Sequence, residues 1–246
     1  MDVETKRLVQ LGFAWCGPLF VLGYIIFWAI LGHNVPPPNM MGMSAAQLVA
    51  EYYGKYQNEI AIGMIGCTTV GMLYTPWSLL IATLLREEDG SFGVLALTEA
   101  AGGILTGWLL AFCPAIWATC ALLVSEISPE LIKALHVMTW IIYDCTYMIT
   151  TIQLVALGVY IVLQKKQTVF PAWTGWCAIA IGIVFIPLVL VPFVSGGPFA
   201  VGGTWNFYLV FGIWLFAFQA PIAYFMLKEV MRRKPAGTPA LASAAH

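Results

Sequence analysis

The residues of this chain whose types could do chemistry gather in one apolar stretch, "HVMTWIIYDCTYMITT", residues 136–151. His136, Asp144 and Tyr147 are candidates for acid and base catalysis. Steps of 100° per residue place them, with their polar and aromatic neighbours, on one arc of a helix. The arc comprises His136, Thr139, Trp140, Tyr143, Asp144, Tyr147, Thr150 and Thr151. The opposite side is apolar, so the pattern predicts a helix with a lipid-facing side and a polar inner wall.

The position of Asp144 limits the states in which it can exist. Counted from Pro129 at 1.5 Å per residue, Asp144 lies about 22 Å along the helix, in the middle third of a bilayer. An ionised carboxylate costs about 2.5–3.5 kcal/mol there, so Asp144 should be protonated, paired or turned towards a water-filled cavity. A hydrogen bond that merely joins two helices is the alternative interpretation. His136 lies nearer the outer surface, where we expect it to pair with a neighbour or meet headgroups.

Composition defines the setting in which these residues work. Hydrophobic residues make up 61% of the 246 residues and charged residues 9%, which leaves too little polar surface for a water-soluble globule. Membrane lipids are therefore partners, and the scattered basic residues argue against a nucleic-acid surface. All six cysteines fall in apolar runs, which argues against disulfides and zinc.

Six apolar runs are long enough to cross about 30 Å of hydrocarbon. They cover residues 8–32, 60–85, 93–124, 132–163, 172–194 and 205–227. We predict an all-α integral membrane protein, a six-transmembrane-helix bundle that forms a single domain over residues 1–232. The continuity of the runs excludes a β-barrel. Residues 233–246 are rich in Pro and Ala and are predicted to be a disordered cytoplasmic tail.

Basic residues predict the orientation of the bundle. Nine of them lie at one end of the predicted spans: Lys6, Arg7, Arg86, Lys165, Lys166, Lys228, Arg232, Arg233 and Lys234. Lys55 and Lys133 lie at the other end. The positive-inside rule then predicts cytoplasmic N- and C-termini, and we expect a multi-pass protein of the cell inner membrane.

The first outer loop should contain a short interfacial helix at about residues 44–58. Ser44 and Gln47 match a capping box at its start. Apolar and tyrosine side chains share one face of this helix: Leu48, Val49, Tyr52, Tyr53 and Tyr56. Such a helix serves either as an anchor in the outer interface or as a lid over the bundle. Ser128 and Pro129 likewise predict the start of the fourth span.

The third span offers a matching face. Gly103 and Gly107 form a G-x-x-x-G motif, which permits close approach of a neighbouring helix, and we expect that neighbour to be the fourth span. Glu99 lies about 9 Å in from the cytoplasmic end of the third span and need not touch Asp144. The predicted ligand pocket between these helices is lined by Asp144, Trp140, Tyr143, Tyr147, Thr151, Glu99, Thr106 and Trp117. Polar residues of other spans could line the same interior: Thr68, Thr69, Tyr74, Thr75, Ser78, Gln153 and Gln219.

No motif indicates a cofactor or a metal. Met40, Met41 and Met43 with His33 could attract copper(I), but their spacing fits no known site and interfacial packing explains them. No two histidines can face each other mid-membrane to hold a haem. The chain also lacks the G-x-x-x-x-G-K-[ST] and H-E-x-x-H motifs, which argues against a nucleotide-driven pump and a zinc protease.

Three function classes remain open. In the first, the bundle binds or passes (transports) a lipophilic or aromatic small molecule through the pocket. In the second, it is a small intramembrane enzyme, an acid/base isomerase or cyclase, that uses Asp144 with His136 or Tyr147 on a lipid or terpenoid substrate. In the third, it is an accessory subunit whose polar face meets another membrane protein or a second copy of the chain. An inward-facing Asp144 would favour the first two.

Overall fold

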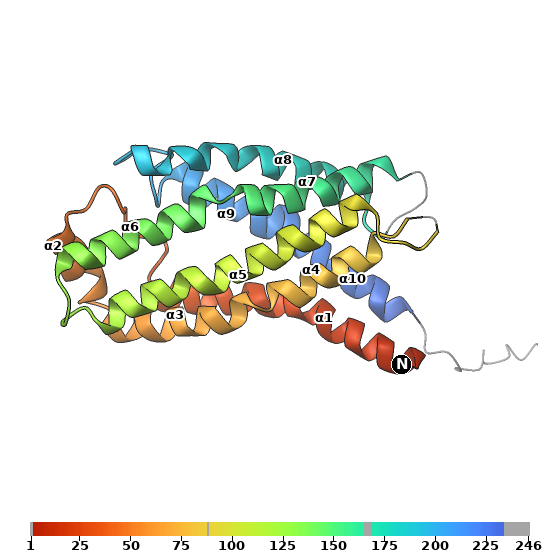
Figure 1. Ribbon diagram of the computed structural model, residues 1–246, viewed down its shortest axis with the longest axis horizontal. Helices are drawn as coiled ribbons and strands as arrows, with labels where there is room; N and C mark the ends of the chain where they lie inside the picture. The colour runs from red at the N-terminus through yellow and green to blue at the C-terminus, as the bar shows by residue number, and fades with distance from the viewer. Residues whose placement is uncertain (1, 88, 165–168, 234–246) are drawn as a thin grey trace, which may run out of the picture.

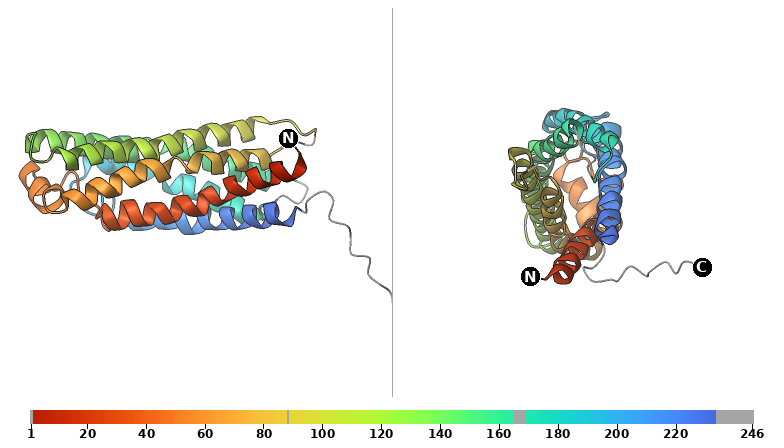
Figure 2. Two further views of the ribbon diagram at one scale, coloured as in Figure 1. Left: turned by 90° about the horizontal axis from the view of Figure 1, so that it is seen from below. Right: turned by 90° about the vertical axis from the view of Figure 1, so that its right-hand side faces the viewer.

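The computed structural model describes residues 2–87, 89–164 and 169–233. Within these ranges the chain is all-α and contains six helical spans long and apolar enough to cross a membrane. The spans are Val3–Leu31, Gln57–Leu84, Val94–Leu122, Pro129–Leu163, Ala172–Phe193 and Thr204–Arg232. They run side by side along the long axis of the molecule (Figures 1 and 2). The six-helix prediction is therefore confirmed, with the first span beginning and the last span ending five residues beyond the predicted limits.

Five of the six spans are interrupted helices. The first joins α1 (Val3–Tyr24) to the π-helical η1 (Ile25–Leu31), and the second joins α3 (Gln57–Gly71) to α4 (Tyr74–Leu84). The fourth joins α6 (Pro129–Cys145) to α7 (Met148–Leu163), and the fifth joins α8 (Ala172–Val184) to the 3₁₀ helix η3 (Ile186–Phe193). The sixth consists of η4 (Thr204–Leu209), α9 (Val210–Ile213), η5 (Trp214–Gln219) and α10 (Ala220–Arg232). Such irregular backbone is tolerated at membrane depth where protein or a cavity surrounds it.

The uninterrupted third span, α5 (Val94–Leu122), packs against α3, α4, α6 and α7. Its G-x-x-x-G motif does not meet the fourth span in the way the sequence suggests. A Cβ on Gly103 would lie 1.7 Å from Ser78 Oγ, and one on Gly107 would lie 2.4 Å from Thr75 Oγ1, so both glycines accommodate α4 of the second span. The close contact with the fourth span uses Gly102, where a Cβ would lie 2.8 Å from Gln153 Cβ on α7.

The loop between the first and second spans forms a short helix that packs on the bundle. It consists of α2 (Ala45–Leu48) and η2 (Val49–Tyr53), and it lies at the opposite end of the bundle from the N-terminus (Figure 1). Ser44 and Gln47 form the predicted capping box. Tyr52 and Tyr53 are 6% and 0% exposed, so they pack on the bundle instead of entering the lipid interface. The choice between an anchor and a lid over the bundle stays a prediction, and we call this packed helix the lid.

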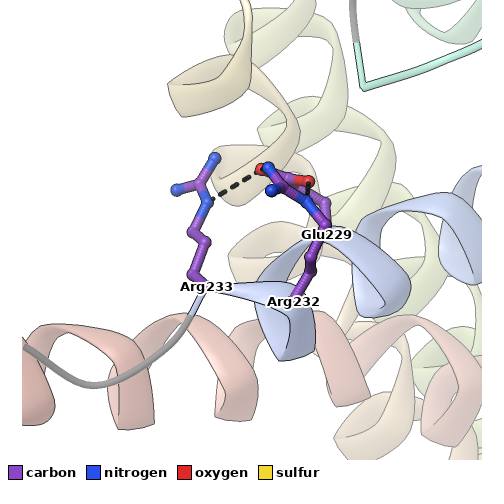
Figure 3. Close-up of polar contacts among 3 residues, drawn as sticks. All are labelled: Glu229, Arg232 and Arg233. Atoms are coloured by element: carbon purple, nitrogen blue, oxygen red, sulfur yellow. Dashed lines mark hydrogen bonds and ion pairs between the residues drawn. The ribbon is translucent and has the colours of Figure 1, made fainter. Parts of the chain in front are cut away.

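The described basic residues divide between the two ends as the sequence indicates. Lys55 and Lys133 lie at the α2 end, and the others lie at the end that carries the N-terminus (Figure 1): Lys6, Arg7, Arg86, Lys228, Arg232 and Arg233. At the end of α10, Glu229 accepts hydrogen bonds from Arg232 and Arg233 (Figure 3). Three of the predicted basic residues lie outside the described residues: Lys165, Lys166 and Lys234. The predicted disordered tail beyond residue 233 lies outside them as well.

Candidate functional site

The polar arc of the fourth span faces the inside of the bundle. Asp144 is 3% exposed and His136 1% exposed, and the apolar side of the same helix carries the exposed side chains Met138, Ile141 and Met148. Four further members of the arc are buried as well, and Tyr147 is half-buried; the four are Thr139, Trp140, Tyr143 and Thr150. The helical period thus correctly separated a lipid side from an inner side.

Asp144 is held by a residue of the sixth span. Asn206 Nδ2 donates a hydrogen bond of 2.7 Å to Asp144 Oδ2. Asn206 Oδ1 accepts from the backbone N–H of Gly202 at 3.1 Å, which ties the amide to the glycine-rich loop before η4. Among the described residues no hydrogen bond reaches the second carboxyl oxygen, Oδ1, and no cation pairs with the group. The pairing that Asp144 required is therefore provided by a neutral amide.

Asp144 also lines an internal cavity. The walls are formed by Thr106, Leu109, Leu110, Tyr143, Asp144, Tyr147, Thr150, Phe185, Leu188, Val210, Phe211 and Trp214. Two hydroxyl groups lie in the cavity wall. Thr106 Oγ1 and Thr150 Oγ1 are 3.0 Å apart and form a hydrogen bond with each other. The cavity volume open to the centre of a water molecule is about 50 Å³. This is enough for a few water molecules. A larger guest requires the aromatic walls to shift.

The cavity lies where the helices are irregular. Tyr147 stands in the break between α6 and α7, and Phe185 and Leu188 stand where α8 gives way to η3. Trp214 begins the π-helical η5. Thr146 contributes to the break because its hydroxyl donates to the carbonyl of Ile142 at 2.6 Å, a bond that competes with the helical ladder. π-Helical segments inside α-helices are frequent at functional sites.

Aromatic rings surround the site. Tyr143 stacks with Phe211 at 6.2 Å between ring centroids and contacts Trp117 at 5.5 Å. Trp117 and Trp140 are 4.9 Å apart. Trp28 continues the cluster towards Trp140 at 6.4 Å. Trp117 and Trp140, which the sequence assigned to the pocket, therefore pack behind its wall and shape it through Tyr143.

His136 lies apart from the cavity, beneath the lid. Its Nδ1 is 2.8 Å from the hydroxyl of Tyr53, and its Nε2 is buried without a hydrogen-bond partner in the described part of the chain. The Tyr52 hydroxyl donates to the carbonyl of Gly32 at 2.7 Å. Burial raises the pKa of both tyrosines. His136 is thus a pairing residue of the lid, two helical turns from Asp144.

Glu99 occupies a separate polar site in the half of the bundle that carries the N-terminus. Ser78 Oγ and Gln153 Nε2 donate to Glu99 Oε1 at 2.7 and 3.1 Å. The Tyr74 hydroxyl donates to Gln153 Oε1 at 2.8 Å. The carboxyl is completely buried. Glu99 and Asp144 make no hydrogen bond to each other, as the spacing on the third and fourth spans indicated.

Several other residues that the sequence placed in the interior do not line the cavity. Thr151 is half-buried and its hydroxyl reaches the Gly182 carbonyl on α8 at 3.5 Å, so it points away from the cavity. Thr69 is exposed, and the Thr68 hydroxyl bonds to the Ile65 carbonyl of its own helix at 2.6 Å, so neither lines the interior. Gln219 is buried, but its amide has no hydrogen-bond partner among the described residues.

Sequence reasoning missed the contributions of the last two spans. Asn206 belongs to the segment "SGGPFAVGGTWN", which looks like an irregular loop, and its signal was a lone amide in the first turn of an apolar span. The cavity residues of these two spans are apolar or aromatic and were also missed: Phe185, Leu188, Val210, Phe211 and Trp214. Nothing in an apolar side chain's type distinguishes a cavity wall from ordinary core.

Within the described ranges, no three His, Cys, Asp or Glu side chains come together in a metal-ligating cluster. The arrangement around Asp144 therefore offers hydrogen bonding and proton transfer as its chemistry. Comparison with models of known protein families, with curated proteins and with solved structures finds no match to this chain. The function has to be argued from the site itself.

Proposed function

We propose that this multi-pass membrane protein binds a small lipophilic or aromatic molecule in the cavity around Asp144 and passes it through the bundle. One observation carries the proposal: a buried carboxyl group with one oxygen held by Asn206 lies in the wall of an otherwise aromatic and apolar cavity. Small-molecule sites have this composition, with few polar groups fixing the orientation of a ligand among apolar walls.

The second carboxyl oxygen of Asp144 supplies the recognition in this proposal. Because the described residues leave Oδ1 without a hydrogen bond, it is available to a hydroxyl or amine donor of a guest, or to water in its place. Thr106 and Thr150 provide hydroxyls in the same lining. A guest with one polar end and an aromatic or aliphatic body satisfies both parts of the lining.

The breaks in the surrounding helices supply the movement in this proposal. The cavity has room for only a few waters, so a larger guest has to displace side chains of the wall, and Tyr147 and Phe211 are among the bulky ones. Tyr147 lies between two helices that share no continuous backbone ladder, and Phe211 lies in the short α9 between two π-helical segments. Side chains at such positions move at smaller cost than those in an uninterrupted helix.

The experiment that tests the proposal is native purification followed by mass spectrometry of co-purifying small molecules. Wild type and Asp144→Asn are compared, with Asp89→Asn as a matched control because Asp89 lies in an exposed loop. We expect a lipophilic compound with wild type and the control, and a reduced amount with Asp144→Asn. Equal ligand content in all three proteins, or none in wild type, would overturn the proposal.

A second candidate function is intramembrane acid/base catalysis on a lipid or terpenoid substrate. The observation in its favour is that Tyr143 and Tyr147 line the same cavity as Asp144, so a carboxyl and two phenols surround one space. Acid/base catalysis needs one group that removes a proton from the substrate and another, of different acidity, that returns one. Conversion of the co-purified compound into an isomer by wild type, absent in Tyr147→Phe, would favour the enzyme over the carrier.

A further inference from the structure

Glu99 is a buried acid that the proposed ligand site does not use. It lies on α5, about 9 Å from Gly93 at the start of the helix, in the half of the bundle that carries the N-terminus. Both of its hydrogen bonds arrive at one oxygen, Oε1. The other oxygen, Oε2, is buried and has no hydrogen-bond partner among the described residues. This carboxyl group is therefore half satisfied.

The surroundings of Glu99 contain no counter-charge. From α4 it meets Ser78 and, through Gln153, the phenol of Tyr74; from α7 it meets the neutral amide of Gln153. In the part of the chain that the structure describes, no Lys, Arg or His forms an ion pair with it. Tyr74 is thus the titratable group nearest to it in this network. The two hydrogen-bond donors stabilise the carboxylate form of Glu99. Burial and the lack of a nearby cation favour its neutral, protonated form.

The packing of α5 is arranged so that this network can form. A Cβ on Gly103 would lie 1.7 Å from Ser78 Oγ and 2.9 Å from Gln153 Nε2, so any larger residue would displace the two donors of Glu99. A Cβ on Gly102 would lie 2.8 Å from Gln153 Cβ. Two adjacent glycines thus bring α4 and α7 close enough for Ser78 and Gln153 to reach one carboxyl oxygen.

Polar residues also lie along α5 and α7 between Glu99 and the cavity of Asp144. Gln153 is one turn of α7 below Thr150, and Thr150 bonds to Thr106 in the cavity wall. On α5, Thr106 lies seven residues from Glu99, about 10 Å along the helix axis. The hydroxyl groups of Thr106 and Thr150 and the amide of Gln153 are therefore spaced along the helices between the two buried acids, with no hydrogen bond joining the two groups among the described residues.

We propose that Glu99 is a reversible proton-binding site in the half of the bundle that carries the N-terminus. The carboxylate takes a proton from hydronium, an O–H bond forms at Oε2, and one water molecule is left behind; release is the reverse. Because Glu99 is completely buried, the packing around it has to open for this exchange. Ser78 and Gln153 continue to donate to Oε1 in both states. This site stands independently of the ligand that occupies the Asp144 cavity.

Infrared spectroscopy of the purified protein tests this proposal directly. Glu99 is the only buried glutamate among the described residues, and Asp144 is the only buried aspartate. Glutamate carrying ¹³C in its side-chain carboxyl therefore marks the Glu99 band in the unmutated protein. We expect a C=O band of a protonated glutamate that disappears as the pH rises and shifts when the protein is transferred to D₂O.

Three variants complete the experiment. Glu99→Gln should lose the band, while Glu126→Gln, a change in an exposed loop, should keep it. Ser78→Ala removes one donor to Oε1 and should move the band to higher frequency, which a glutamate elsewhere would not show. A protonated-glutamate band that responds neither to pH nor to D₂O, or no such band at any pH, would show that Glu99 only joins the helices and would overturn the proposal.

Discussion

Asn206 at the start of the sixth span donates a hydrogen bond of 2.7 Å to Asp144 in the fourth span, 62 residues away. The pair is buried, so removal of the amide leaves a carboxyl group without its only described partner. Asn206→Ala should lower the free energy of unfolding by about 1–3 kcal/mol, the cost of leaving such a group unsatisfied. Thermal unfolding in detergent measures the change, with Asn58→Ala on the exposed surface of α3 as the matched control.

A double variant tests whether the bond itself is responsible. Asp144→Ala combined with Asn206→Ala should destabilise less than the sum of the two single changes, because each single change leaves the other group unpaired. Strict additivity would contradict the coupling that the geometry indicates.

Gly103 is where α5 and α4 approach most closely. Gly103→Ala places a Cβ 1.7 Å from Ser78 Oγ, so the helices have to separate, and we expect a loss of about 1–3 kcal/mol in the free energy of unfolding. Gly12→Ala on α1 is the control, since a Cβ there meets nothing within 4 Å and alanine favours the helix. Ser78→Gly in the Gly103→Ala background should recover part of the loss. Equal stability of both alanine variants would refute the close contact.

Alkaline pH should weaken the lid formed by α2 and η2. Burial raises the pKa of Tyr52 and Tyr53 above the ordinary tyrosine value of 10.0. The unfolded chain then loses these protons before the folded protein does, so the stabilisation is complete below about pH 10 and declines above it. Melting temperatures measured from neutral pH upwards should fall less steeply for Tyr53→Phe than for wild type. Tyr208→Phe, at a position 56% exposed, should follow wild type.

The positive-inside rule predicts that the end with the N-terminus faces the cytoplasm. Single cysteines at exposed positions near the two ends of the bundle test this in intact cells with a maleimide that cannot cross membranes. Asn58→Cys, near the α2 end, should react at once, and Asp89→Cys, at the other end, only after the membrane is opened. Wild type gives the background from the six native cysteines. The reverse pattern would invert the topology.

Apolar length and helical period were sufficient to predict the six spans and the inward side of the fourth. Both depend only on the residues of one segment and on whether lipid or protein surrounds that segment. The capping box at Ser44 and the start at Pro129 were predictable for the same reason, because caps depend on residues three or four apart. Features that depend on one segment's own pattern were thus readable from the chain.

Features that depend on two distant segments were not. Gly103 and Gly107 indicate a close helix neighbour but do not say which helix: both lie against α4, and Gly103 also lies against Gln153 of the fourth span. The partner of Asp144 was equally hidden, because Asn206 gives no periodic signal at the end of a glycine-rich loop. The cavity itself is a gap between apolar side chains, and its size depends on how the helices pack rather than on residue types.

The break after Asp144 has a consequence for membranes of different thickness. The fourth span has 35 residues, about 52 Å at 1.5 Å per residue, against about 30 Å of hydrocarbon. α6 and α7 have 17 and 16 residues, so the joint lies at the centre of two nearly equal arms. Each arm can change its own tilt when the bilayer becomes thinner or thicker, as long spans do. The acid at the joint then stays at mid-depth while the outer ends of the arms absorb the change.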